Sequence, residues 1–270
     1  RLSHVAMRVS MRTILGTLSL SLCLLLSESA GGAVGLASGT PGKNGMIMLI
    51  AYADVPPYYI ADSKDQNNGI LMDVLRAVTR PLNRTVTFRR LPDKRGWDML
   101  EHGGVDLYAS AREWVDDPDR FLWTNPFMTN EDVLVYRSGS PLIYSGAESL
   151  FGKTVACIKG FVYPALQAHF EPGAIERIDT TSPEAMLELL TLGRADAALV
   201  NHTEIRWILR TQNDLKRHRF RIDPHPVDRA FYRFLFPKGR GWKPMVGQFN
   251  RRLQTMREDG SLKAILGRYR

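Results

Sequence analysis

Short apolar runs alternate with amphipathic segments along residues 46–110 of the chain. Residues 46–53, 85–91 and 105–110 have the length and apolar content of strands. Between them, residues 68–82 and 94–102 place apolar side chains at helical spacing. Strand, helix, strand, helix, strand in this order is typical of a mainly parallel sheet that is flanked by helices. We therefore predict an α/β lobe over this part of the chain.

A second α/β series follows an extended apolar run at residues 131–137. Ser182 and Pro183 form a good helix start, with Ser182 as the N-cap and Pro183 at the first helical position. The pattern predicts strands at residues 154–158, 175–179 and 195–200, and helices at residues 163–170, 183–192 and 203–209. Residues 230–236 form another apolar run, and helices are predicted at residues 244–256 and 261–269.

Two α/β series joined by two extended crossings predict a two-lobed fold with a cleft between the lobes. We place the first part of lobe 1 at residues 38–138 and lobe 2 at residues 139–225. Residues 226–270 are predicted to return to lobe 1 as a crossing strand and C-terminal helices. Because ligands of such sheets bind outside the carboxyl ends of the strands, the cleft is the expected site.

Residues 1–37 are predicted to be a secretory signal peptide and leader. Arg8 and Arg12 precede an apolar run at residues 14–26, and small residues follow it. That run is shorter than the roughly 20 residues that a membrane-spanning helix needs. Cleavage is expected after Ala33 or Ala37, and translation from Met7 or Met11 unless the sequence is a fragment. This segment predicts a periplasmic protein.

Net charge and cysteine content do not alter the prediction of an exported two-lobed protein. The formal charge of +8 falls to +6 once the leader is removed, since the leader holds three arginines and one glutamate. The basic cluster at residues 216–221 is expected to be a solvated segment facing anionic lipid or a partner, since an exported protein rarely meets nucleic acid. Once the leader is removed, Cys157 is the one cysteine that remains. Its apolar neighbours in the sequence predict a buried structural thiol.

The sequence lacks the common motifs of cofactor and metal sites. It has no Walker loop, no Gly-x-Ser-x-Gly elbow, no cysteine pair and no His-Glu-x-x-His. We therefore predict neither a cofactor nor a metal.

Six short motifs follow one another along the chain. They are Pro57-Tyr58-Tyr59 with the helix that begins Asn68-Gly69-Ile70, Gly103-Gly104-Val105-Asp106, Thr124-Asn125-Pro126-Phe127, Gly152-Lys153-Thr154-Val155-Ala156, Gly193-Arg194-Ala195-Asp196-Ala197 and Asp259-Gly260-Ser261-Leu262. In this order they resemble the motifs of the bacterial extracellular solute-binding proteins of family 3, the periplasmic receptors for polar amino acids. The resemblance covers nearly the whole chain after the leader. It implies two α/β lobes and a monomeric receptor that passes a small solute to an inner-membrane permease of the ABC type or to a sensor.

The positions that hold the ligand in this family are altered in this sequence. The arginine expected to hold the ligand carboxylate falls near Asp117, and the second-lobe carboxylate is replaced by Asn201. The basic candidates nearby are Arg112 and Arg120. A small polar or anionic solute that resembles an amino acid is therefore expected, rather than an ordinary zwitterionic amino acid. The candidate ligand-binding residues are Tyr58, Arg95, Ser110, Arg112, Phe161 and Asn201.

Two other interpretations stay open. The resemblance extends to cyclohexadienyl dehydratases, enzymes on the same scaffold, for which His202 or Glu113 could supply a proton. The altered positions also fit a sensor or interaction module that has lost its ligand. We favour a receptor without catalytic residues.

Overall fold

The computed structural model describes residues 45–51, 55–61, 67–212, 214 and 220–269. The predicted leader and most of the basic cluster lie outside these residues. In the first lobe, strands β1 (Gly45–Ala51) and β4 (Thr85–Leu91) pair in parallel with Met46 opposite Val86. Met48 bridges in parallel to Leu107, just before strand β5 (Tyr108–Ala111). The predicted strand, helix, strand order is therefore present.

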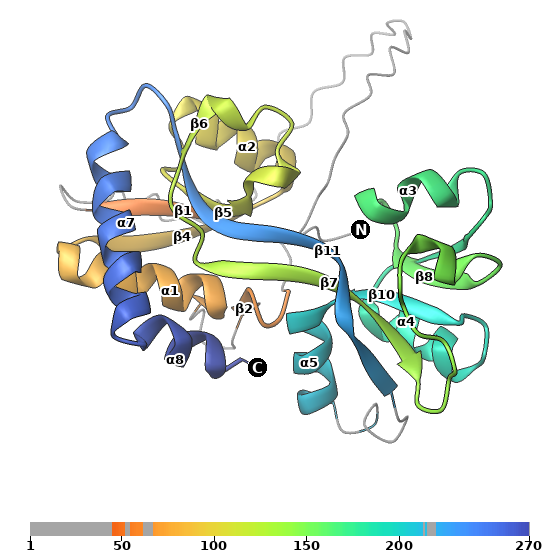
Figure 1. Ribbon diagram of the computed structural model, residues 1–270. Coiled ribbons are helices and arrows are strands. Elements are labelled where there is room, and N and C mark those ends of the chain that lie inside the picture. Colours follow the sequence, from red (N-terminus) through yellow and green to blue (C-terminus); the bar gives the residue numbers. More distant parts are fainter. Residues whose placement is uncertain (1–44, 52–54, 62–66, 213, 215–219, 270) are drawn as a thin grey trace, which may run out of the picture.

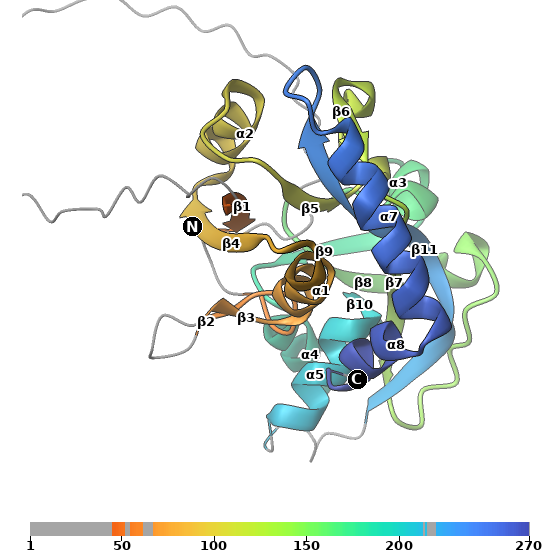
Figure 2. The same ribbon diagram turned by 90° about the vertical axis from the view of Figure 1, so that its left-hand side faces the viewer.

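Helix α1 (Ile70–Thr79) is the central helix of the first lobe. Its apolar side chains Leu71, Val74 and Leu75 are fully buried. It packs against α7 (Lys243–Glu258) and α8 (Ser261–Gly267), so the C-terminal helices lie on the first lobe, as Figures 1 and 2 show. Burial of these apolar side chains stabilises the lobe by about 25 cal/mol for each Å² removed from water. Helix α2 (Asp93–His102) and strand β6 (Phe121–Trp123) complete this lobe.

The second lobe is a parallel arrangement of three strands covered by helices. Strand β8 (Thr154–Ile158) pairs in parallel with β9 (Glu176–Thr180) and β10 (Ala197–Asn201). Helices α4 (Pro183–Thr191) and α5 (His202–Thr211) bury one apolar cluster, and α3 (Pro164–Phe170) covers another. Both clusters are separate from the apolar core around α1.

Two long antiparallel strands cross between the lobes, as Figure 1 shows. They are β7 (Met128–Arg137) and β11 (Phe220–Pro237), whose pairing shifts register near Pro226. Through them one sheet runs in the order β5, β11, β7, β10, β8, β9, with β6 paired to β11. The crossing strands fix how the two lobes face each other. Short strands β2 (Ile60–Ala61) and β3 (Asn67–Asn68) form a hairpin beside α1.

The α/β two-lobed fold class is confirmed, and most predicted elements lie within a few residues of their observed bounds. The return crossing is the largest correction: β11 has 18 residues, whereas only residues 230–236 were predicted. Pro224 and Pro226 interrupt the apolar alternation, and the polar side chain of Asp223 is buried at 1 % exposure. Asp223 accepts hydrogen bonds from the Tyr136 hydroxyl at 3.1 Å and from the Tyr144 backbone N–H at 3.2 Å. These bonds keep a polar residue inside the strand.

Cys157 is fully buried in β8, as predicted, and burial raises the pKa of its thiol to about 12. A thiol that keeps its proton is a poor nucleophile. None of the helices in the described ranges is both long enough and apolar enough to span a bilayer.

Candidate functional site

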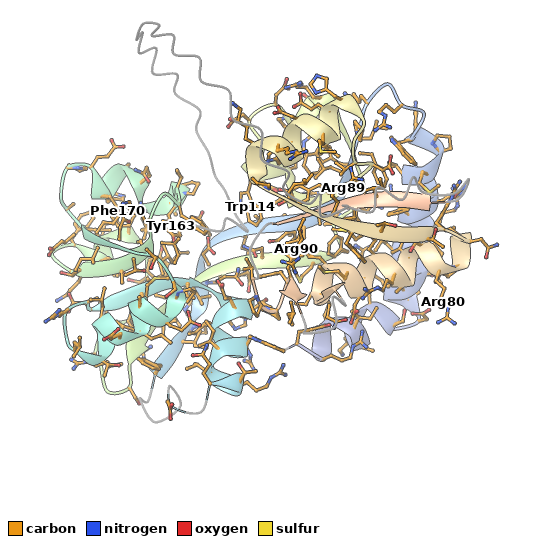
Figure 3. The ribbon with its side chains drawn as sticks, turned by 180° about the vertical axis from the view of Figure 1, so that it is seen from behind. Arg80, Arg89, Arg90, Trp114, Tyr163 and Phe170 are labelled. Carbon is orange, nitrogen blue, oxygen red and sulfur yellow. The ribbon has the colours of Figure 1, made fainter. Side chains whose placement is uncertain are left out.

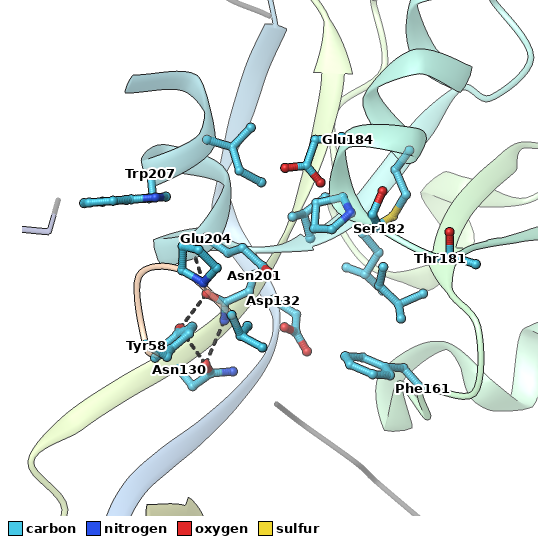
Figure 4. Close-up of a pocket in the computed structure, with 18 of the residues that line it drawn as sticks. Tyr58, Asn130, Asp132, Phe161, Thr181, Ser182, Glu184, Asn201, Glu204 and Trp207 are labelled. Carbon is cyan, nitrogen blue, oxygen red and sulfur yellow. Dashed lines mark hydrogen bonds between the residues drawn. The ribbon is translucent and has the colours of Figure 1, made fainter. Parts of the chain in front are cut away.

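A cavity of about 290 Å³ lies between the lobes, and side chains of both lobes line it. Val55, Tyr58, Trp114 and Tyr232 come from the first lobe or the crossing strands next to it. Phe161, Glu184, Asn201, Glu204 and Trp207 come from the second lobe. Figure 4 shows this arrangement, with Tyr58 on one side and Phe161 and Thr181 on the other. Its volume is close to the lower end of the range for small-molecule pockets, about 300–1,000 Å³.

Tyr58 reaches the cavity from a tight turn that depends on Gly69. The backbone N–H groups of Ile70 and Leu71, at the start of α1, donate to the carbonyls of Pro57 and Tyr58. Gly69 has φ +118°, and a Cβ there would lie 2.3 Å from the Tyr58 carbonyl oxygen. Glycine is therefore required for the turn to pack against the helix, because other residues rarely adopt this backbone conformation.

The Tyr58 hydroxyl connects the first lobe to the second. It contacts Asn130 Oδ1 at 3.0 Å and donates to Asn201 Oδ1 at 2.7 Å. Asn201 Nδ2 in turn donates to Asn130 Oδ1 at 2.7 Å. We call these three residues the Tyr58–Asn130–Asn201 link; Figure 4 shows its hydrogen bonds as dashed lines. Burial raises the pKa of Tyr58, so its hydroxyl stays protonated and can donate.

Asn201 has a second task as the N-cap of α5. Its Oδ1 accepts from the backbone N–H groups of Thr203 at 3.0 Å and Glu204 at 3.1 Å. Ser182 caps α4 in the same way through Ala185, as the sequence predicted. Both helices therefore begin at the cavity, and each carries a glutamate in its first turn, Glu184 or Glu204.

Three carboxylates line the cavity: Asp132, Glu184 and Glu204. Asp132 lies on β7 directly opposite Asn201 of β10, and Figure 4 shows its carboxylate turned toward Phe161. Glu184 Oε1 accepts from Gln212 Nε2 at 2.7 Å. Burial, together with the charges of Glu184 and Asp132, raises the pKa of Glu204 to about 8. Among the described lining residues there is no lysine, arginine or histidine.

Two polar atoms on the first-lobe wall have no hydrogen-bond partner within the described ranges. They are the Trp114 indole Nε1 and the Tyr232 hydroxyl, both buried. The two rings meet edge to face at 5.3 Å, and Tyr58 lies 5.3 Å from Tyr232. Figure 3 shows Trp114 where the first lobe meets the second. A buried polar group without a partner costs about 1–3 kcal/mol.

The structure brings three of the six predicted ligand-binding residues together and places the other three outside the cavity lining. Tyr58, Phe161 and Asn201 line the cavity. Arg95 is exposed on α2, and Ser110 is buried within β5. Arg112 pairs with Asp119 at 2.5 Å on a half-exposed surface. Their role in binding stays a prediction.

The other charged and titratable candidates also lie outside the residues that line the cavity. Arg120 pairs with Glu101 at 2.5 Å and lies 3.9 Å from Asp117. Glu113 pairs with Arg233 at 3.5 Å. His202 begins α5 beside Asn201, but it does not line the cavity.

Sequence reasoning did not single out Asp132, Glu184 or Glu204. Glu184 follows the predicted N-cap and proline, and an acidic residue there is ordinary because the positive end of a helix favours it. The sequence gives no sign that the first turns of two helices and a crossing strand meet at one place. Within the described ranges, no group of three or more histidine, cysteine or acidic residues could hold a metal ion.

Solved structures with the same fold include receptors, a sensor and a precursor of an enzyme. The second substrate-binding domain of GlnP from Lactococcus lactis, in its open conformation, has a TM-score of 0.67 at 19% identity, covering 85% of this chain and 97% of that one. A histidine kinase sensor domain similar to periplasmic binding proteins has a TM-score of 0.63 at 23% identity, covering 84% and 96%. An ancestral amino-acid-binding protein, described as a precursor of cyclohexadienyl dehydratase, has a TM-score of 0.62 at 17% identity, covering 84% and 95%. These likenesses show the fold.

No curated protein sequence matches the chain. The sequence profile of the bacterial extracellular solute-binding proteins, family 3, matches residues 47–270, which is nearly all of the chain after the predicted leader. This match agrees with the order of the six motifs and with the two lobes joined by crossing strands. The chain belongs to the bacterial extracellular solute-binding proteins, family 3.

Proposed function

We propose that the protein is a periplasmic receptor that captures a small solute in the cavity between its lobes and delivers it to an inner-membrane permease or to a sensor. The observation that carries this proposal is the cavity itself, because both lobes line it and the Tyr58–Asn130–Asn201 link joins them beside it. A ligand that contacts both lobes favours the arrangement in which they face each other closely.

Aromatic and polar side chains make the cavity suitable for a small polar molecule. Tyr58, Phe161 and Tyr232 provide apolar contact area, while Asp132 and Ser182 provide polar contacts at defined places. This mixture is typical of small-molecule sites. The proposal covers both uptake and sensing, because receptors with this fold take part in one or the other.

A thermal-shift screen of residues 38–270 tests the proposal. The panel contains amino acids, dicarboxylates, keto acids and amines, and each hit is confirmed by calorimetry. A solute at about 100 times its Kd adds roughly 2.7 kcal/mol to the free energy of unfolding. We expect Phe161→Ala to lose the stabilisation by the solute and Arg112→Ala to keep it, because Phe161 lines the cavity and Arg112 does not. Loss in Arg112→Ala alone would move the site away from this cavity, and no response to any solute would contradict the proposal.

A dehydratase is a second candidate, favoured by one observation. The pKa of Glu204 is raised to about 8, so this carboxyl group keeps its proton at neutral pH, as a general acid must. His202 and Glu113, the candidates from the sequence, do not line the cavity. The test is turnover of prephenate or arogenate by the purified protein. Turnover that Glu204→Gln abolishes would support the enzyme, and no turnover at high protein concentration would exclude these two substrates.

A further inference from the structure

We propose that Arg177 on β9 is a positioning residue for the cavity: it fixes the turn between β8 and α3, and this turn brings Phe161 to the cavity wall. The inference rests on the proposed receptor function and names a residue on which solute binding depends. Ile158, at the end of β8, and residues 161–163, before α3, line the cavity. Arg177 itself is not among the lining residues. It therefore acts on a solute through the turn.

The guanidinium of Arg177 holds the turn at two points. Its Nη2 donates to the backbone carbonyl oxygens of Ile158 and Phe161, both at 3.0 Å. Its Nε donates to Asp179 Oδ1 on the same strand at 2.7 Å. Because the guanidinium is a rigid planar fork, these bonds fix the two carbonyls relative to β9. The side chain is only 18% exposed, so water competes little for these bonds.

Two aromatic rings hold the same guanidinium from the side of α3. Arg177 lies over the ring of Tyr163 at 5.5 Å and over that of Phe170 at 5.4 Å from the ring centres, and Figure 3 labels both rings in the second lobe. Ring faces attract a cation, and a planar guanidinium also stacks on them. The Tyr163 hydroxyl accepts a hydrogen bond from the Ile158 backbone N–H at 3.2 Å. Arg177 and Tyr163 thus close the turn together.

The outer part of the turn is open to solvent. The ladder between β8 and β9 ends where the Lys159 backbone N–H donates to the Thr180 carbonyl at 2.9 Å. Gly160 follows, is exposed, and would meet no atom within 4 Å of a Cβ. The Phe161 backbone N–H donates back to the Ile158 carbonyl at 3.1 Å. Without the guanidinium, a solute would have to order this turn on binding, which lowers affinity.

Arg221 provides a matched control in the second lobe. It lies on β11, and its Nη2 donates to the backbone carbonyls of Ser140 at 3.4 Å and Leu142 at 2.5 Å. Its guanidinium lies over the ring of Tyr136, 4.5 Å from the ring centre. None of these four residues lines the cavity. The contacts of Arg221 and Arg177 are therefore of one kind, so a merely structural role would give both alanine variants the same effect on binding.

Calorimetry with six probes measures the effect on binding: arginine, glutamine, glutamate, succinate, pyruvate and putrescine. For a probe that binds the wild type, Arg177→Ala should raise the Kd about tenfold or more, because the turn has to be ordered on binding. Arg221→Ala should change the Kd less than about twofold, because distant sites act independently. Arg177→Lys keeps the charge but not the planar fork, so it should weaken binding as well, and it serves if the alanine variant does not fold.

Hydrogen exchange of the solute-free protein measures the turn itself. In Arg177→Ala the backbone N–H of Phe161 should exchange about tenfold faster than in the wild type, because the turn opens locally more often. In Arg221→Ala the same N–H should keep its wild-type rate. All variants are compared on protein with an intact unfolding transition.

The outcomes separate this inference from the receptor function. Equal Kd values in Arg177→Ala and Arg221→Ala would overturn the inference and leave the receptor function standing. An unchanged exchange rate of Phe161 in Arg177→Ala would overturn it too. If the wild type binds none of the six probes, the result counts against the receptor function, and the inference falls with it.

Discussion

At the scale of single residues, Glu204 is the side chain whose state depends most on its surroundings. Its pKa is raised from 4.5 to about 8, because burial and the charges of Glu184 and Asp132 disfavour ionisation. Between these two values the unfolded chain has lost the proton and the folded chain has kept it. The folded state then binds more protons, so the free energy of unfolding falls as pH rises from about 4.5 to 8.

Glu204→Gln should remove this fall in the free energy of unfolding with rising pH. We expect the variant to have nearly the wild-type free energy of unfolding at pH 4, and to be more stable than the wild type at pH 8. Urea denaturation at a series of pH values measures the difference without a ligand. Glu188→Gln serves as the control, since Glu188 is exposed and its exchange should give parallel curves. Parallel curves for Glu204→Gln as well would show that this carboxyl titrates normally.

The sequence could indicate part of the candidate site, and the reason differs from residue to residue. Asn201 could be found because it ends β10 and caps α5, and Tyr58 because it lies in the turn after β1, since ligands meet an α/β sheet at the ends of its strands. Glu204 could not, since an acidic residue in the first turn of a helix is common at solvated helix ends too. Arg112 also follows a strand, but its guanidinium pairs with Asp119. Only the packing of two lobes distinguishes these cases.

At the scale of elements, the turn at Tyr58 and the start of α1 form one unit through Gly69. Gly69→Ala should lower the free energy of unfolding by about 3 kcal/mol, because the φ of +118° is strained for alanine and its Cβ would approach the Tyr58 carbonyl to 2.3 Å. Urea denaturation measures the change. It should also weaken ligand binding, since Tyr58 would move.

Gly173→Ala is the matched control for this prediction. Gly173 also has a positive φ, +74°, but a Cβ there would meet no atom within 4 Å. Its exchange should cost only about 1–2 kcal/mol, the ordinary penalty of a left-handed backbone. If Gly69→Ala and Gly173→Ala lower the free energy of unfolding equally, the close approach to the Tyr58 carbonyl does not contribute to the loss.

The elements themselves were largely predictable because periodicity and local signals agree. Strand β8 has the bounds that the apolar run predicts, and Ser182 caps α4 as its position indicates. Strand β11 was not predictable over residues 220–229, where prolines and a buried aspartate hide the pattern. A crossing strand is defined by its partner β7, and a pairing with residues 83 to 104 positions earlier in the chain leaves no local signal.

At the scale of the whole molecule, the two lobes meet at the cavity through the Tyr58–Asn130–Asn201 link, while β7 and β11 join them covalently. Tyr58→Phe removes the hydroxyl but keeps the ring in the apolar core. Tyr136→Phe is the matched control, because the Tyr136 hydroxyl bonds to Asp223 between β7 and β11 rather than between the lobes. Each variant should lose about 1 kcal/mol of stability, the usual net value of one hydrogen bond.

Only Tyr58→Phe should change the relation between the lobes. We expect a larger radius of gyration for this variant than for the wild type in small-angle X-ray scattering without ligand, because the hydrogen bonds that favour close lobes are lost. A saturating solute should reduce the radius, since it contacts both walls and favours the closed arrangement by its differential affinity. Tyr136→Phe should keep the wild-type radius. An unchanged radius in Tyr58→Phe would mean that β7 and β11 alone hold the lobes, and that closure does not depend on the link.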